Sequence, residues 1–346
     1  MEKRLKVLLY SNKEKAIDKV VLDRHLDTLI EALKLANIDY TFSKDDNFDI
    51  VHLFNYDQYK HFKSLRLKAN QKNAPVIIEA FNDYNDFKIS DKEEGEKSSS
   101  SLIVFRPETL KAYNDSNRIL VAYSKEKTFI ENQRVSVDVN VLKPGVQDIK
   151  KNELSDYEKQ AFRSFYNLEP DCKVIVSLGD YSNYESVDTI INLARIMPDY
   201  EFFFYGVRDN SKYLSKLQKD ASKVLNIHLE YLGYEELFNS MVYNTDLLIV
   251  TSPLIIESLN ILNFMKAKIP VISIEGKAIY ELLEENKTAL IYRDFKDLYD
   301  KVKNIETTNC VDEAYKYASK FDMESYSNEI KKIYESVLNT ERQKRD

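Results

Sequence analysis

The sequence predicts an α/β protein built from two doubly wound domains, each with a parallel β-sheet that helices cover on both faces. Two observations support this prediction. Short apolar runs alternate with helical patterns along almost the whole chain, which is the rhythm of βαβ units. The 346 residues also exceed the size at which one hydrophobic core keeps growing, and an apolar content of 43% is enough for two buried sheets.

The first domain is expected over residues 1–147. Its predicted strands are the apolar runs at residues 6–10, 50–54, 76–80, 103–105 and 120–123, and residues 22–36 have a helical pattern. One segment breaks the alternation. Residues 90–101 contain the charged, serine-rich run D-K-E-E-G-E-K-S-S-S-S, which predicts a mobile loop.

A second domain is expected over residues 148–325, after Pro144-Gly145 and a charged linker. Its predicted strands cover residues 174–178, 201–205, 228–231, 247–250, 271–274 and 289–292. Residues 326–346 are expected to form a C-terminal helix, for which a return to the first domain is one option. The relative order of strands and helices therefore gives each half its own sheet.

Composition narrows the classes of function. A net charge of -7 argues against general nucleic-acid binding, which needs a basic face. The two cysteines, Cys172 and Cys310, form no C-x-x-C, so no disulfide framework or metal site is expected. With neither a leader-like apolar segment nor a membrane-length run, we expect a cytoplasmic protein, with peripheral contact at the inner membrane face as an option.

One basic segment, residues 56–72, is a candidate for that membrane contact. It sets apolar residues against Lys60, Lys63, Arg66 and Lys68. An amphipathic helix of this kind suits an anionic membrane surface. The alternative is an ordinary solvated helix face whose lysine stems cover apolar surface.

The positions of the glycines argue against another class of function. Five of the six follow directly after apolar runs, where turns need a residue without a side chain, and these are Gly145, Gly179, Gly206, Gly233 and Gly276. None of their spacings matches a dinucleotide-binding or Walker motif, which argues against an NAD or ATP enzyme. No cofactor is expected. The four histidines are interpreted as packed or solvated residues rather than as bases.

A stretch of the second half carries a family resemblance. Residues 251–271 read T-S-P-L-I-I-E-S-L-N-I-L-N-F-M-K-A-K-I-P-V, a helix between two apolar strands. The layout resembles the signature of GT-B glycosyltransferases of family 4, also called glycosyl group 1. V-L-K-P-G-V at residues 141–146 and I-V-S-L-G-D at residues 175–180 resemble further landmarks of that family. L-A-R-I-M-P-D-Y-E-F-F-F-Y-G, residues 193–206, resembles bacterial glycosyl-diacylglycerol synthases in particular.

The resemblance implies a GT-B fold, and it also shows departures at the expected active site. In the ungapped alignment the two glutamates of the family signature fall on Ile255 and Asn263, so no catalytic residue is assigned. Glu257 lies two residues from the first of these positions. It is either a displaced sugar-binding acid or a residue favoured by the dipole of a helix first turn.

Other elements of the family site are also replaced. The Arg-Lys pair that would clamp a diphosphate corresponds to Tyr184 and Glu185, and a glutamate there repels phosphate. The glycine-rich loop after the first strand corresponds to residues 10–15, which contain no glycine. The histidine after a strand of the first domain corresponds to A-F-N-D at residues 80–83.

The nucleotide-sugar cleft that the resemblance implies is assigned to ten residues: Gly179, Asp180, Tyr184, Glu185, Gly206, Gly233, Ser252, Glu257, Ser258 and Lys266. Three functions remain open. The leading hypothesis is a catalytically degenerate GT-B protein that acts as the partner or activating subunit of an active glycosyltransferase. The alternative is a divergent metal-independent enzyme that moves a sugar from a UDP-sugar to a lipid or cell-surface glycan. A nucleotide or sugar sensor is the third.

Overall fold

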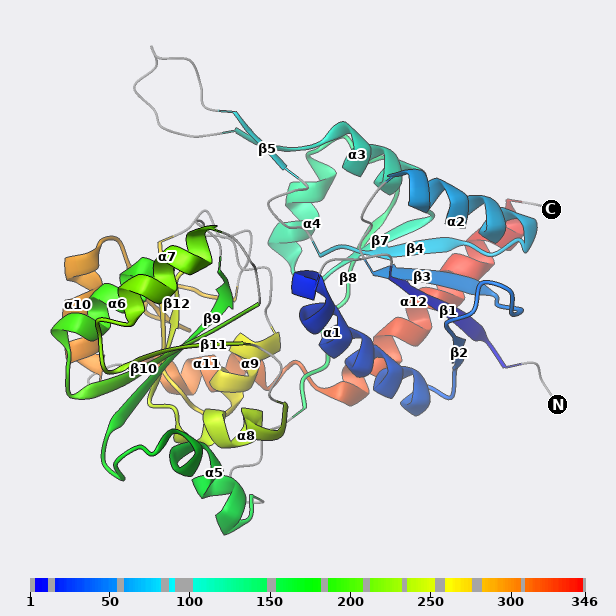
Figure 1. Ribbon diagram of the computed structural model, residues 1–346. Helices are drawn as coiled ribbons and strands as arrows, with labels where there is room; N and C mark the ends of the chain where they lie inside the picture. Colours follow the sequence, from blue (N-terminus) through cyan, green and yellow to red (C-terminus); the bar gives the residue numbers. More distant parts are fainter. Residues whose placement is uncertain are drawn as a thin grey trace. The chain divides into compact units, whose positions relative to one another are not determined.

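The computed structural model describes residues 4–11, 16–54, 59–81, 87–90, 102–147, 154–181, 186–207, 212–231, 235–252, 259–275, 282–305 and 309–344. The chain forms two compact units, and Figure 1 labels their elements. The first unit consists of Met1–Glu14, His25–Gly145 and Met323–Asp346. The second consists of Lys15–Arg24 and Val146–Asp322.

The first unit contains a six-stranded parallel sheet with the order β2-β1-β3-β4-β7-β8. Its strands are β1 (Lys6–Ser11), β2 (Asp39–Thr41), β3 (Ile50–Phe54), β4 (Val76–Glu79), β7 (Arg118–Val121) and β8 (Val139–Val141). Its helices are α1 (Ala16–Leu35), α2 (Tyr59–Gln71), α3 (Pro107–Asn114), α4 (Ser124–Glu131) and α12 (Met323–Gln343). The start of α1 is grouped with the second unit.

Alternation along β3 divides the core of this unit between the two faces of the sheet. Val51 and Leu53 join a buried cluster with Phe62 and Leu65 of α2. His52, on the opposite face, is fully buried and forms a hydrogen bond with Tyr334 of α12. The C-terminal helix therefore packs on the sheet of the first unit.

A two-stranded hairpin interrupts the parallel order of the first unit. β5 (Phe87–Ser90) and β6 (Leu102–Phe105) pair antiparallel. The sequence predicted only the second of these strands. The loop predicted at residues 90–101 falls almost entirely outside the described residues.

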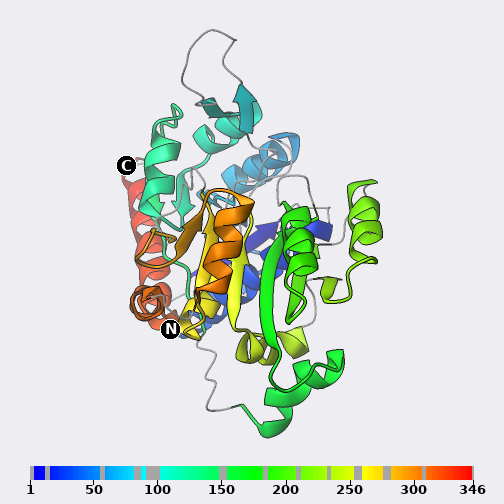
Figure 2. The ribbon, with the colours of Figure 1, turned by 90° about the vertical axis from the view of Figure 1, so that its left-hand side faces the viewer.

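The second unit contains another six-stranded parallel sheet, with the order β11-β10-β9-β12-β13-β14. Its strands are β9 (Lys173–Asp180), β10 (Tyr200–Val207), β11 (Ile227–Tyr231), β12 (Leu247–Val250), β13 (Val271–Ile274) and β14 (Leu290–Tyr292). Its helices are α5 (Asp156–Tyr166), α6 (Val187–Ile196), α7 (Lys212–Ala221), α8 (Glu235–Asn244), α9 (Leu259–Lys266), α10 (Phe295–Lys303) and α11 (Cys310–Ala318). Figure 2 shows α10, in orange, against the strands of this sheet.

Local sequence explains why these helices begin where they do. Ser155 caps α5 by accepting a hydrogen bond from the backbone N–H of Glu158, whose carboxylate accepts one from the backbone N–H of Ser155 in return. This reciprocal arrangement is a capping box. Asp294 caps α10 in the simpler way, accepting from the backbone N–H of Asp297. The prediction of two doubly wound parallel sheets is confirmed.

None of the helices within the described ranges is long and apolar enough to cross a membrane.

Candidate functional site

The strand order of the second unit defines where a ligand would bind. The chain continues from β9 to β10 and β11 on one side, and β12 lies on the other side of β9. Such a reversal opens a crevice outside the carboxyl ends of the two strands at the switch point. Leu247–Ile249 pair with Ile175–Ser177, so Gly179 and Asp180 end β9 close to Thr251 and Ser252, which follow β12. Three predicted cleft residues, Gly179, Asp180 and Ser252, are therefore neighbours at this edge.

Gly206 is needed at its position for packing. It lies opposite Gly179 in the ladder between β10 and β9. A Cβ atom at Gly206 would lie 2.6 Å from the ring of Tyr181, which is too close for any side chain. The turn after β9 therefore depends on a glycine in the neighbouring strand.

The Tyr181 ring is buried beneath that turn. Its hydroxyl donates to the carbonyl oxygens of Phe204, at 3.1 Å, and Glu230, at 2.6 Å. Burial raises the pKa of Tyr181 far above its ordinary value, so the hydroxyl stays protonated. The tyrosine anchors the residue next to Asp180 to the neighbouring strands.

Helix α9 begins at Leu259, after residues 253–258 of the family signature, which lie outside the described residues. Asn263, one of the two positions where the family has a glutamate, lies half-buried in its second turn. Asn260 in the first turn is buried and accepts a hydrogen bond from the guanidinium of Arg24. That guanidinium also lies 4.2 Å from the ring centre of Phe238 in α8. Arg24 is a cation that the sequence analysis did not assign to this site, and only the fold could reveal it.

Lys266 ends α9 and is engaged elsewhere. Its ammonium nitrogen donates to the carbonyl oxygen of Val146 at 2.7 Å and to that of Phe321 at 3.1 Å. Both carbonyls belong to the segments that connect the second unit to the rest of the chain. These contacts engage the ammonium group of Lys266, and its assignment to the nucleotide-sugar cleft stays a prediction.

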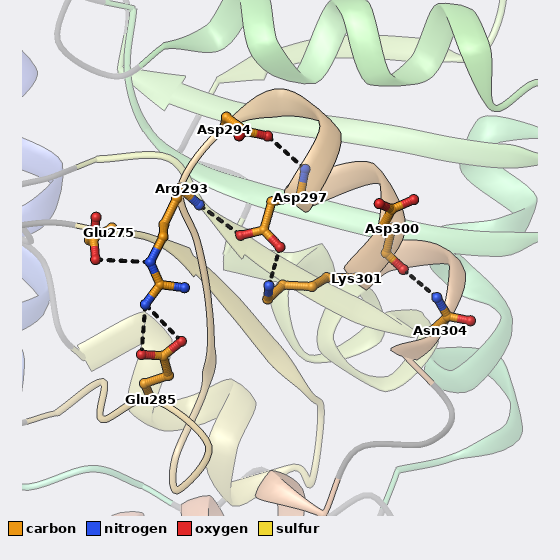
Figure 3. Close-up of polar contacts among 8 residues, drawn as sticks. All are labelled: Glu275, Glu285, Arg293, Asp294, Asp297, Asp300, Lys301 and Asn304. Atoms are coloured by element: carbon orange, nitrogen blue, oxygen red, sulfur yellow. Dashed lines mark hydrogen bonds and ion pairs between the residues drawn. The ribbon is translucent and has the colours of Figure 1, made fainter.

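Arg293 follows β14 and forms ion pairs with two acids (Figure 3). Its Nε donates to Glu275 at 3.2 Å, and its Nη2 donates to both carboxylate oxygens of Glu285, at 3.1 and 2.9 Å. The hydrogen bond with Glu285 raises the pKa of Arg293 above its ordinary value. The guanidinium charge of Arg293 is therefore already paired with carboxylates.

The first turns of α10 continue this polar network, as Figure 3 shows. The backbone N–H of Arg293 donates to the carboxylate of Asp297 at 3.0 Å. Lys301, one turn later, also donates to that carboxylate, and this contact lowers the pKa of Asp297. The network orders the loop between β14 and α10, and both Arg293 and Lys301 are paired with carboxylates within it.

Five of the ten predicted cleft residues lie outside the described residues, and these are Tyr184, Glu185, Gly233, Glu257 and Ser258. So does Ile255, the position of the first family glutamate. Their roles therefore stay predictions. Among the residues that are described, no group of three or more His, Cys, Asp or Glu side chains is arranged to hold a metal ion.

The structure shows what each side of the candidate membrane helix, α2, contacts. Phe62 and Leu65 of α2 are buried in the core of the first unit, with Tyr59 packed against it, so the apolar stripe does not face a membrane. Lys63 and Lys68 are exposed, and Lys68 forms an ion pair with Asp45 at 3.3 Å.

The other two cations of α2 differ. Arg66 is half-buried and donates to Asn117 at 2.7 Å, and burial lowers its pKa. Lys60 has a side chain that is not described. Leu67 is 57% exposed and belongs to the same helix as the exposed Lys63 and Lys68.

The first unit contains a buried polar cluster, His52, Glu79 and Tyr334, that sequence reasoning missed. One ring nitrogen of His52 lies 2.9 Å from the Glu79 carboxylate, and the other lies 2.7 Å from the Tyr334 hydroxyl. Glu79 ends β4, and a glutamate at the end of an apolar strand was the available signal. His25 of α1 packs on Phe81, with ring centres 4.3 Å apart. Phe81 belongs to residues 80–83, the segment that corresponds to the family histidine.

Comparisons with known proteins agree with this architecture. The family model described as "Glycosyl transferases group 1" matches residues 158–322. A processive diacylglycerol alpha-glucosyltransferase of Acholeplasma laidlawii is 24% identical over 351 residues, covering 98% of this chain and 100% of the relative.

Solved structures show the same fold. Anabaena Alr3699/HepE in complex with UDP and glucose matches with a TM-score of 0.71 and 14% identity, covering 96% of this chain and 100% of that one. A glycosyltransferase of Rickettsia africae ESF-5 matches with a TM-score of 0.68 and 12% identity, covering 98% and 99%. The chain therefore has the GT-B fold, and residues 158–322 are similar to the glycosyl transferases group 1 family.

Proposed function

We propose that this GT-B protein has lost sugar transfer and acts as a non-catalytic partner of an active glycosyltransferase. The proposal rests on one observation: two cations of the second unit are already hydrogen-bonded to groups of the protein itself. Lys266 is bonded to two backbone carbonyls, and Arg293 is bonded to two carboxylates. A diphosphate leaving group needs cations directed at it, because its charge develops in the transition state. The amide at Asn263 adds to this argument, since it cannot act as a carboxylate.

Calorimetry with UDP-glucose, UDP-galactose and GDP-mannose tests the proposal directly. We expect no heat of binding at concentrations that reveal micromolar affinity, about -8 kcal/mol. The host protein that co-purifies with the chain is expected to be a glycosyltransferase whose activity rises when purified chain is added back. A chain that purifies alone and transfers sugar would refute the proposal.

Restoring the acids provides a second test. The double variant Ile255→Glu, Asn263→Glu places carboxylates at both positions of the family signature. Little transfer is expected, because Tyr184 and Glu185 still occupy the positions of the diphosphate clamp. The biological role is expected to be unchanged.

A second candidate is an active lipid glucosyltransferase, and two observations favour it. The Acholeplasma laidlawii relative, a diacylglycerol glucosyltransferase, aligns over its whole length. Arg24 provides a guanidinium at the first turn of α9, next to the family signature. In this hypothesis Arg24 meets the donor phosphates and Glu257 acts as the displaced acid.

The matched variants for this candidate are Arg24→Gln and Arg195→Gln. Arg195 lies in α6 and donates to Asn192 within the same exposed helix face, so its loss is the control. If the chain is an enzyme, Arg24→Gln lowers UDP-glucose affinity by about tenfold and Arg195→Gln leaves it unchanged. Glu257→Ala then abolishes transfer to diacylglycerol.

Either role is compatible with a cytoplasmic protein that contacts the inner membrane face peripherally. Lys63, Leu67 and Lys68 would make that contact through the exposed face of α2. Flotation with anionic vesicles is expected to weaken as salt increases and to fall in the variant Lys63→Glu, Lys68→Glu. Equal recovery with neutral vesicles would exclude an electrostatic membrane role.

A further inference from the structure

The second unit has an edge strand, β11, that differs from the other edge strands of the molecule. The edges of the two six-stranded sheets are β2, β8, β11 and β14. β2, β8 and β14 have three residues each, whereas β11 has five. Proteins commonly protect a sheet edge by keeping its strand short or by placing Pro or Lys in it. β11 reads I-H-L-E-Y and uses none of these devices.

The alternation of the backbone decides which groups of β11 face away from the sheet. A backbone N–H of β10 donates to the carbonyl oxygen of Asn226, directly before β11. A parallel strand bonds to one neighbour through every second residue, so His228 and Glu230 also direct their backbone groups to β10. The backbone groups of Ile227 and Leu229 therefore point to the other side, where the described residues provide no further strand.

The two faces of β11 carry different kinds of side chain. Ile227 belongs to the apolar core of the second unit, and Leu229 and Tyr231 pack against that core. Side chains alternate along a strand, so His228 and Glu230 lie on the opposite face. Both are partly exposed. The edge therefore carries one imidazole and one carboxylate on the same face, two residues apart.

The imidazole of His228 has a fixed position at this edge. Its Nε2 lies 2.9 Å from the carboxylate of Glu201 in β10, and its ring stacks on that of Phe203 with centres 4.3 Å apart. The Tyr166 ring of α5 lies 5.4 Å away. The His228 side chain is still 25% exposed. It can therefore meet a further acid at the edge without rearranging.

The sequence of β11 is complementary to itself in one antiparallel register. The outward backbone groups of two copies can bond only if Ile227, Leu229 and Tyr231 face residues of the same set. Centring the pair on Leu229 places His228 opposite Glu230 of the second copy, and symmetry repeats this pair. Opposite charges across a strand pair attract and like charges repel. A shift of one copy by two residues would instead set histidine against histidine or glutamate against glutamate.

We propose that the chain forms a symmetric homodimer in which two copies of β11 pair antiparallel about Leu229. The two Leu229 residues exchange both backbone hydrogen bonds, and the two pairs of His228 with Glu230 set the register. The second-unit sheets of the two copies then form one continuous sheet. This interface lies on the second unit and does not depend on whether the chain transfers sugar.

Sedimentation velocity of the full-length chain tests the register by exchanging charges. Glu230→Arg puts a cation opposite His228, and the double variant Glu201→Gln, His228→Glu puts a carboxylate opposite Glu230 without crowding Glu201. Each alone is expected to weaken the dimer by about tenfold. An equal mixture of the two restores opposite charges in both pairs and is expected to recover the original affinity.

Two controls accompany the charge exchange. Glu201→Gln alone and Glu313→Arg, on the exposed face of α11, are expected to leave the dimer unchanged. A monomeric original protein would overturn the proposal. So would a mixture that stays as weak as its two components, because the pairs would then not face each other.

The backbone contact has its own test at Leu229. Leu229→Pro removes the outward N–H and is expected to abolish the dimer, whereas Leu229→Ala keeps the N–H and is expected to dimerise. Hydrogen exchange of the original protein gives a readout that needs no variant. The Leu229 amide is expected to exchange more slowly as the protein concentration rises, and the His228 amide, bonded to β10, to stay constant. Leu229 exchange that is independent of concentration would overturn the proposal.

Discussion

Two polar clusters, one in each unit, use the same chemistry in opposite surroundings. His52, Glu79 and Tyr334 of the first unit are buried, with no exposure of the His52 side chain and 11% exposure of the Glu79 side chain. Arg293, Glu275 and Glu285 of the second unit are exposed at 49%, 59% and 42%. Water competes for the exposed pairs and screens them, whereas burial shields the groups of the first cluster from water. The buried cluster is therefore expected to determine stability, and the exposed cluster to order a loop.

The largest expected effect comes from breaking the buried cluster at its centre. His52→Leu leaves the Glu79 carboxylate buried without its partner, and a broken buried pair costs about 3 kcal/mol of the free energy of unfolding. Because the chain has no tryptophan, urea unfolding is followed by circular dichroism and assigned to a unit by hydrogen exchange. His61→Leu in α2 is the control. Equal stability of the two variants would show that the cluster contributes nothing.

A smaller loss is expected at the edge of the same cluster. Tyr334→Phe removes one hydroxyl and keeps the ring, so about 1 kcal/mol should be lost, with faster exchange in α12. Tyr157→Phe, at a position that is 82% exposed, should change nothing. If α12 exchanges at the same rate in both variants, the bond to His52 does not hold the helix.

The stability that the network beside Arg293 contributes is expected to depend on pH, which gives a further test of the exposed cluster. The hydrogen bond from Lys301 lowers the pKa of Asp297 in the folded state. An acid of this kind adds stability above its unfolded pKa and loses it as pH falls through the folded value. Asp297→Asn should therefore be less stable than the original protein at neutral pH, and the difference should begin to shrink below about pH 4 and vanish once the pH is below the lowered pKa of Asp297. A difference that persists in acid would assign the effect to the helix start instead of the charge.

The smallest effect is expected at Arg293 itself. Arg293→Gln removes both ion pairs at an exposed position, so the unfolding midpoint should stay within experimental error at physiological salt. Hydrogen exchange in residues 282–292 should increase, because the arginine connects Glu285 to the end of β14. A lowered midpoint would mean that the exposed cluster also contributes to the free energy of unfolding, as the buried cluster is expected to do.

Much of the fold was predictable because strands are read from local apolar runs. The strands predicted at residues 50–54, 247–250 and 271–274 have those bounds in the structure. The antiparallel β5–β6 pair was not predicted, since nothing in a four-residue strand shows the direction of its partner. The apolar stripe of α2 was identified, but its direction toward the core was decided by packing.

By itself, the sequence determined the two α/β domains and the strand-end glycines, because these follow from periodicity and residue identity, whereas the replacement of both family glutamates stays a prediction. Only the tertiary structure decided which charges meet. The partners of His52 lie 27 and 282 positions away, and those of Lys266 lie 120 and 55 positions away. Such pairs form where separate segments are brought together by the burial of two cores, and the residues between them carry no signal of that meeting.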